Sequence, residues 1–112
     1  MFRTAGKARR RKDVANMIKI VARMLVKADK IEEFKATARE LVEKSRAEAG
    51  NVFYSLNVNT ANPRLLAFIE CWKDQDALDS HKSTEHFTGI IPKLIEMCEE
   101  RLPGDLFTEV EY

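Results

Sequence analysis

The order in which the hydrophobic period changes along the chain constrains the fold more than any other feature. In residues 17 to 27, the side chains alternate with a period of two, which predicts a β-strand. Asp29 can then cap a helix whose apolar side chains recur at helical spacing as far as Val42, and Gly50 lies beyond its expected end. The chain is therefore expected to begin its domain with a strand followed by a helix.

The middle of the chain predicts a β-hairpin. Residues 51–59 and 64–72 are rich in β-branched and aromatic side chains, and they flank a turn that contains Asn62 and Pro63. The second strand of this hairpin has apolar side chains on both of its sides. A strand with one side in water would show a polar side. We therefore expect both faces of the sheet to be covered.

The last third of the chain predicts two helical stretches and a strand. Asp74 and Thr84 are suitable caps for the start of each helical stretch. Pro103 and Gly104 are expected to end the second one. Alternating side chains from 106 to 112 then predict the last strand.

The resulting order is β-α-β-β-α-β, which predicts an α+β domain with the ferredoxin-like fold. In this fold a four-stranded antiparallel sheet carries both helices on one face. The other face needs its own cover here, because large exposed apolar patches usually mark an interface. A second copy of the sheet is the simplest cover, so we expect a homodimer in the form of a dimeric α+β barrel.

Length and charge divide the chain into a short leader, residues 1–16, and one domain, residues 17–112. The leader contains six basic residues and one acidic residue, a local net charge of +5 within a whole-chain charge of +1. We expect a basic, disordered extension; a nucleic-acid arm or an organellar transit peptide is the alternative. Charged residues interrupt every apolar run before the roughly 20 residues that a bilayer requires. The expectation is a cytoplasmic protein that binds neither nucleic acid nor a membrane.

Residue spacing argues against several kinds of site. Cys71 and Cys98 lack CxxC spacing, so both are expected to be reduced and mostly buried. His81 and His86 are five residues apart and do not share a helical face, so no metal site is expected. The four glycines form no phosphate-binding motif, so no nucleotide cofactor is expected.

The stretch FIECWKDQDALDSHKSTEHF, residues 68–87, resembles a known family. Its pattern is a strand that ends in Glu70, one further residue and Trp72, followed by a capped turn, His81 and the run STEHF. The stretch EAGNVFYSL, residues 48–56, is similar to the Glu-x-Gly turn of the same family. The family is that of the antibiotic biosynthesis monooxygenases, in particular its small quinol-monooxygenase-like members. The resemblance extends over the whole predicted domain and implies the same dimeric barrel.

The resemblance implies an enzyme that oxidises a small aromatic quinol, phenol or anthrone with O2. Such enzymes use no metal, flavin or haem cofactor, so the substrate supplies the electrons. The protein has to bind a flat ring in an apolar cavity, help to remove a phenolic proton and keep water away from the anion. The expected partners are the aromatic substrate, O2 and a second copy of the chain.

Four residues of the matching stretch are candidates for the site. His81 is the candidate catalytic base, because imidazole titrates at about pH 6.5 and the family pattern places a histidine here; it could equally be a surface residue or a hydrogen-bonded tie. Trp72 could stack on a planar substrate or belong to the core. His86 and Phe87 could line the mouth of the pocket, although Phe87 could simply be the first apolar residue of its helix.

Two strand residues complete the candidates for substrate binding. Tyr54 can face the pocket only if Asn57 faces away, because the two lie on opposite sides of one strand unless a bulge intervenes. Arg23 lies among apolar neighbours in the first strand. It could pair with an anionic oxygen of the substrate, or form a salt bridge with Glu70 or a C-terminal glutamate in a dimer interface.

Other functions are compatible with the same fold. Haem-degrading relatives share the spacing from Trp72 to His81, but they carry an Asn in the first strand where this chain has Arg23. The branch that acts on phosphorylated autoinducer-2 also resembles residues 73–86, which implies an isomerase-like enzyme without O2. A non-catalytic dimer that binds a small ligand is the third possibility. Fold resemblance alone does not decide among them.

Overall fold

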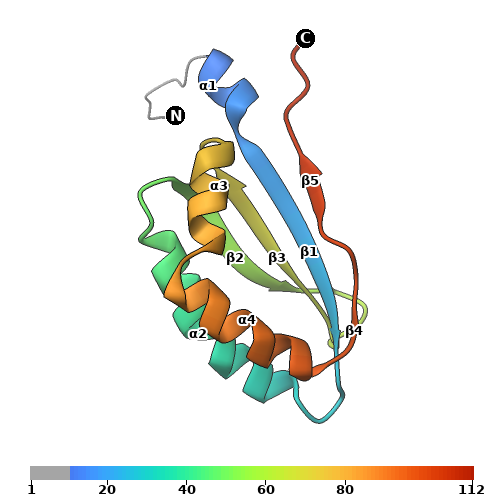
Figure 1. Ribbon diagram of the computed structural model, residues 1–112. Coiled ribbons are helices and arrows are strands. Elements are labelled where there is room, and N and C mark those ends of the chain that lie inside the picture. The colour runs from blue at the N-terminus through green and yellow to red at the C-terminus, as the bar shows by residue number, and fades with distance from the viewer. Residues whose placement is uncertain (1–10) are drawn as a thin grey trace, which may run out of the picture.

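Figure 1 shows the computed structural model, in which one antiparallel sheet carries the longer helices on one face. Residues 11–112 are described. The elements in chain order are α1 (Arg11–Asn16), β1 (Ile18–Val26), α2 (Ile31–Arg46), β2 (Asn51–Val58), β3 (Leu65–Trp72), α3 (Gln75–Lys82), α4 (Glu85–Glu96), β4 (Cys98–Arg101) and β5 (Asp105–Phe107). The strand order is β2-β3-β1-β4, and β5 also pairs with β1. The predicted ferredoxin-like α+β fold is confirmed.

The side chains of β1 alternate between two different environments. Its hydrogen-bonded partner β3 runs antiparallel, from the Ile18–Trp72 pair to the Leu25–Leu65 pair. The even-numbered side chains of β1 face the helices, and Met24 among them is only 4% exposed. The period of two seen in the sequence therefore reports a strand with one face in the core.

The helix-facing side of the sheet forms the hydrophobic core. Helices α2 and α4 lie side by side across it (Figure 1). Each fully buried large apolar side chain stabilises the fold by about 1.5–3 kcal/mol. Large apolar residues of this core include Phe34 and Leu41 from α2, Leu94 from α4, and Phe68 and Trp72 from β3.

The opposite face of the sheet is only partly covered. Arg23 of β1 is exposed on this side, and Phe53 of β2 is 43% exposed. Apolar residues Leu65, Ala67 and Ile69 of β3 are half-buried here. The two-sided apolar character predicted for this strand is thus present in the structure.

Two of the three expected helix caps are confirmed. The side chain of Asp74 accepts a hydrogen bond from the backbone N–H of Ala77 at 2.8 Å, and Thr84 caps α4 in the same way. The cap expected at Asp29 is wrong. Lys30 is the residue before α2, with no side-chain cap, because a turn closed by the Lys30 N–H and the Lys27 carbonyl comes first.

The expected end of the last helix and the expected last strand are also wrong. Helix α4 ends at Glu96, well before Pro103, and the chain then runs back along β1 as two short strands instead of one. Pro103 lies between them and has no N–H to donate to a ladder. Residues 108–112 follow β5 and are not in a strand.

The leader was expected to be disordered throughout residues 1–16. Residues 11–16 instead form the short helix α1, and the N–H of Met17 donates a hydrogen bond to the carbonyl of Val14 at 3.1 Å. The rest of that expectation concerns residues 1–10, which lie outside the described part of the chain. Among the described residues, none of the helices combines the length and the apolar character needed to cross a bilayer.

A pair of glycine substitutions tests the packing between α3 and the turn before β2. A Cβ atom on Gly50 would overlap the Cβ atom of Ala77, whereas one on Gly89 of α4 meets nothing within 4 Å. Gly50→Ala is expected to lower the free energy of unfolding by about 1–3 kcal/mol. Gly89→Ala is expected to raise it by about 0.5–1 kcal/mol, because glycine disfavours a helix interior. Urea unfolding measures both, and equal effects would contradict the close approach at Gly50.

Candidate functional site

A cavity of about 200 Å³ lies between the helix-facing side of the sheet and helices α3 and α4. Its polar groups come from a tyrosine, a glutamate, a histidine and two basic residues, and the remaining wall is mostly apolar. The lining residues are Ile20, Ala22, Met24, Tyr54, Phe68, Glu70, Leu78, His81, Lys82, Phe87, Ile91, Arg101, Gly104 and Leu106. The C-terminal segment thus closes a space that the sheet and the helices leave open.

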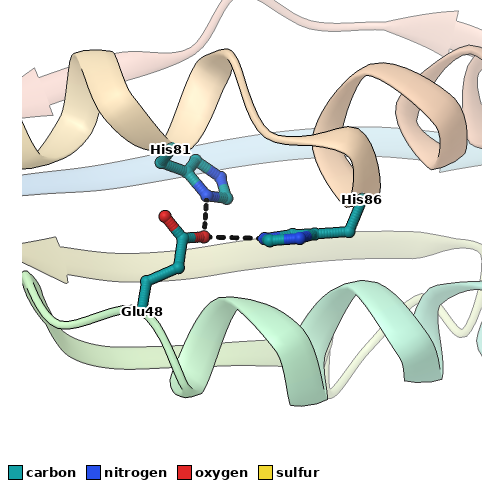
Figure 2. Close-up of side chains that lie close together, drawn as sticks. All are labelled: Glu48, His81 and His86. Carbon is teal, nitrogen blue, oxygen red and sulfur yellow. Dashed lines mark hydrogen bonds and ion pairs between the residues drawn. The ribbon is translucent and has the colours of Figure 1, made fainter.

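His81 is the buried polar group with the most distinctive surroundings on this wall. It lies near the end of α3 and is 1% exposed. Its Nδ1 atom is 2.7 Å from Oε2 of Glu48, as Figure 2 shows. Its Nε2 atom is buried and has no hydrogen-bond partner among the described residues. One ring nitrogen is therefore fixed, and the other is free.

The hydrogen bond to Glu48 sets the tautomer of His81. An ionised carboxylate can only accept hydrogen bonds, so Nδ1 has to carry the proton. In the neutral ring, Nε2 then holds a lone pair. Burial lowers the pKa of His81, while the Glu48 carboxylate acts in the opposite direction. The neutral ring with an unprotonated Nε2 is the form that can accept a proton.

Glu48 is held by the turn between α2 and β2. Its N–H donates to the carbonyl of Ser45 at 3.1 Å, and its carbonyl accepts from the N–H of Asn51 at 3.0 Å. Both bonds hold the backbone, so the carboxylate points at the helices from a fixed position. Sequence reasoning missed this role, although the Glu-x-Gly turn at Gly50 was part of the resemblance.

His86 is the second histidine bound to Glu48. Its Nε2 atom lies 2.8 Å from the same Oε2 atom (Figure 2). It does not line the cavity, so the structure does not bring it to the pocket mouth.

Thr84 brings the two histidines together. Its hydroxyl donates to the carbonyl of His81 at 2.8 Å and accepts from the N–H of Phe87 at 3.2 Å. One side chain therefore helps to end α3 and begins α4.

The expectation that no metal is bound rested on the spacing of the two histidines within one helix, whereas the structure places them on different helices. The ligand atoms of Glu48, His81 and His86 all lie within 4.8 Å of one another. Glu48 and His86 have side chains 14% and 13% exposed. These three residues have the chemistry and the proximity to hold a metal ion.

Trp72 contacts two residues of the site without lining the cavity. It is fully buried and does not line the cavity, so the structure does not place it against a bound ring. Its ring centroid lies 4.3 Å from that of His81, and its Nε1 donates to Oε1 of Glu70 at 2.9 Å. Trp72 thus fixes the orientation of two polar residues that do line the cavity.

Phe87 and Tyr54 both line the cavity wall. The Phe87 ring meets the His81 ring edge to face, with centroids 5.0 Å apart at 73°. Tyr54 is 2% exposed, and burial raises the pKa of its hydroxyl well above the ordinary value. Asn57 lies on the other side of β2, where its amide bonds the carbonyl of Ala67.

Arg23 is the candidate that the structure separates from the others. It is exposed and does not line the cavity, because its odd-numbered position on β1 directs it away from the helices. The structure therefore does not bring Arg23 to this cavity, and its other predicted role, a salt bridge in a dimer interface, stays a prediction.

Glu70 is a further polar group of the wall that the sequence analysis considered only as a salt-bridge partner. It is 6% exposed. Burial raises the pKa of Glu70 to about 7, although the Trp72 N–H opposes the shift. The cavity wall therefore carries a carboxyl group that titrates near neutral pH.

The shifted carboxyl predicts a pH-dependent stability. The unfolded chain ionises at Glu70 near the ordinary value of 4.5, and the folded chain only at about 7, so stability is lost as the pH rises between these values. The loss is at most about 3 kcal/mol. Glu70→Gln keeps an oxygen for Trp72 and is expected to flatten this slope. Urea unfolding from pH 5 to pH 8 measures the slope of the free energy of unfolding against pH, and Glu85→Gln is the exposed control. Parallel slopes for the wild type and Glu70→Gln would rule out the contribution of Glu70.

Comparisons with known proteins show the family of this chain. The family model for the antibiotic biosynthesis monooxygenases matches residues 17–93. YcnE of Bacillus subtilis (strain 168), a provisionally named monooxygenase, is 40% identical over 86 residues, which are 77% of this chain and 90% of YcnE.

Two solved structures extend the likeness to the fold. A conserved protein from Methanosarcina mazei Go1 has a TM-score of 0.85 and 29% identity, covering 88% of this chain and 98% of that chain. A crystal structure of an antibiotic biosynthesis monooxygenase has a TM-score of 0.74 and 34% identity, covering 85% of this chain and 98% of that chain. The chain belongs to the antibiotic biosynthesis monooxygenase family.

Proposed function

We propose that the protein is a cofactor-independent monooxygenase that oxidises a small aromatic quinol or phenol with O2. The observation that carries this proposal is the free Nε2 atom of His81, buried on the wall of a mostly apolar cavity. A buried nitrogen with a lone pair and no partner is suited to accept a proton from a bound hydroxyl group. Family membership supports the oxygen chemistry.

His81 is the proposed general base of this reaction. Glu48 accepts a hydrogen bond from Nδ1 of His81. This interaction becomes more favourable when the ring gains a second proton and a positive charge. The substrate anion that results is electron-rich and can pass electrons to O2. The apolar wall formed by Phe68, Phe87 and Ile91 keeps water from the anion.

The size of the cavity favours one class of substrate. An apolar protein cavity of about 150 Å³ takes up benzene. The cavity here, at about 200 Å³, therefore suits a single substituted ring and lies below the roughly 300 Å³ at which larger ligand pockets begin. A monocyclic quinol or phenol fits this space better than the three fused rings of an anthrone.

The reaction balances without an external reductant. A ring with two hydroxyl groups loses both hydroxyl hydrogens and one ring hydrogen, forms one C–O bond to an oxygen atom from O2, and takes back one of these hydrogens on the new hydroxyl group. One atom of O2 becomes the new hydroxyl oxygen of a hydroxyquinone. The other atom leaves as water, together with the remaining two hydrogens. All four electrons that reduce O2 come from the substrate.

We also propose that the protein acts as a cytoplasmic homodimer. The sheet face that carries Phe53 and Ile69 is apolar and only partly covered, and a second copy of the same face would bury it. Cys98 is not part of a disulfide, which suits a reducing compartment.

An isotope experiment tests the oxygen chemistry. The chelator-treated protein is incubated with a monocyclic quinol under ¹⁸O2, and oxygen uptake is followed together with product mass. We expect protein-dependent uptake and one labelled atom in the hydroxyquinone. Oxygen uptake that produces hydrogen peroxide and leaves the quinone without label would show an oxidase instead. Heat-denatured protein corrects for spontaneous oxidation.

A pair of substitutions tests the role of His81. His81→Ala removes the base, so kcat/KM is expected to fall by about 100- to 10,000-fold. Glu48→Gln keeps the shape of the carboxylate, but its amide N–H can donate to Nδ1 and leave the proton on Nε2, so it should also slow the reaction. Glu85→Gln, an exposed change next to His86, is the matched control. Rates of His81→Ala equal to the wild type would remove His81 from the mechanism.

One observation favours a second candidate function. Lys82 and Arg101 both line the cavity and are exposed, so they could hold a phosphate group at its rim. This suits the isomerase-like alternative that acts on a phosphorylated, non-aromatic substrate. Saturation by a small sugar phosphate, with no oxygen uptake from any quinol, would favour that function. Ligand binding with no turnover of either class would indicate a non-catalytic binding protein.

A further inference from the structure

We propose that Glu48, His81 and His86 form a binding site for a zinc-type divalent cation, and that the cation switches off the free nitrogen of His81. The site itself stands on the geometry of the three residues. Only its effect on turnover rests on the function proposed above.

The three ligand atoms already converge. Oε2 of Glu48 lies 2.7 Å from Nδ1 of His81 and 2.8 Å from Nε2 of His86, and all three atoms lie within 4.8 Å of one another. Ligands of a tetrahedral zinc ion lie about 3.3 Å apart, since each bond is about 2.0–2.1 Å long. To bind the ion, the carboxylate oxygen would withdraw by about half an ångström, and the two imidazole nitrogens, which lie within 4.8 Å of each other, would settle at about 3.3 Å.

The ligand set selects the kind of cation. Two imidazoles and one carboxylate suit Zn²⁺ and its neighbours in the transition series, whereas Mg²⁺ prefers oxygen ligands alone. Three protein ligands leave a fourth position for water. Among the side chains that the structure describes, the ion pairs of Glu48 are made with the two histidines, so no lysine or arginine occupies the carboxylate.

A solvent groove gives the cation access. Glu48 lines a groove of about 480 Å³ on the surface, together with Asp74, Asp76, Ser80 and Thr84. This groove and the cavity of about 200 Å³ described above share none of their lining residues. His81 lies between the two, because its Nδ1 atom meets Glu48 and its ring lines the cavity. A cation that enters from the groove and binds Nδ1 can thus change the state of a side chain, His81, that lines the cavity.

Coordination changes which nitrogen of His81 carries the proton. Without the cation, Nδ1–H donates to Glu48 and Nε2 has the lone pair. A cation on Nδ1 requires a lone pair there, so the proton moves to Nε2, and the ring stays neutral. His86 undergoes the reverse exchange between its own nitrogens. No net proton is gained or lost, but Nε2 of His81 becomes a donor and can no longer act as a base.

A zinc titration without substrate tests the site. Protein free of any polyhistidine tag is treated with chelator and titrated with Zn²⁺ in a calorimeter. We expect one ion per chain, no comparable binding of Mg²⁺, and a loss of affinity of at least about tenfold in both Glu48→Gln and His86→Ala. Glu85→Gln should bind as the wild type does. Wild-type affinity in Glu48→Gln and His86→Ala, or no zinc binding at all, would overturn the site.

Nitrogen NMR tests the switch. With ¹⁵N-labelled imidazoles, Nε2 of His81 is expected to move from the resonance of an unprotonated nitrogen to that of a protonated one when Zn²⁺ is added. Zinc binding that leaves Nε2 unprotonated would overturn the switch. Both measurements omit the quinol, so they can succeed even if the proposed oxygenation fails. If oxygenation succeeds, added Zn²⁺ should inhibit it, and chelator should restore it.

Discussion

A single carboxylate oxygen organises the candidate site. Oε2 of Glu48 receives hydrogen bonds from two histidines that come from different helices. Because an ionised carboxylate only accepts, this one atom decides the tautomer of His81 and leaves the buried Nε2 atom without a partner among the described residues. The same atom ties the turn after α2 to the junction of α3 and α4, so the position of the base depends on how these helices are packed against the sheet.

The chemistry of the cavity follows from the desolvation of the polar groups around it. His81 is 1% exposed and stacks against Trp72, so its charged form loses hydration, and its pKa is lowered. Glu70 shares the same environment, and burial raises the pKa of its carboxyl to about 7. Trp72 links the two, because its ring lies against His81 while its N–H holds Glu70. Trp72, which does not line the cavity itself, thus positions two of the polar residues that do.

The fold was largely predictable, and its failures are local. Period-two alternation in β1 and the hairpin of β2 and β3 follow from side-chain patterns that the sheet preserves. The Asp29 cap failed because a turn after Lys27 starts the helix one residue later, without a side-chain cap. The last strand failed because apolar alternation continues to Tyr112, whereas pairing with β1 extends only to Phe107. Alternation states which side chains could share a face, and hydrogen bonding to a neighbour decides where a strand ends.

The sequence by itself determined the order of the elements and the family pattern around His81, because side-chain periodicity distinguishes a helix from a strand. Only the tertiary structure decided that Glu48 joins His81 and His86, since these residues lie far apart in the chain or on separate helices. It also separated Arg23 from the cavity and moved Trp72 behind it. Sequence spacing describes one helix or strand at a time, whereas a site with three residues depends on how several elements pack together.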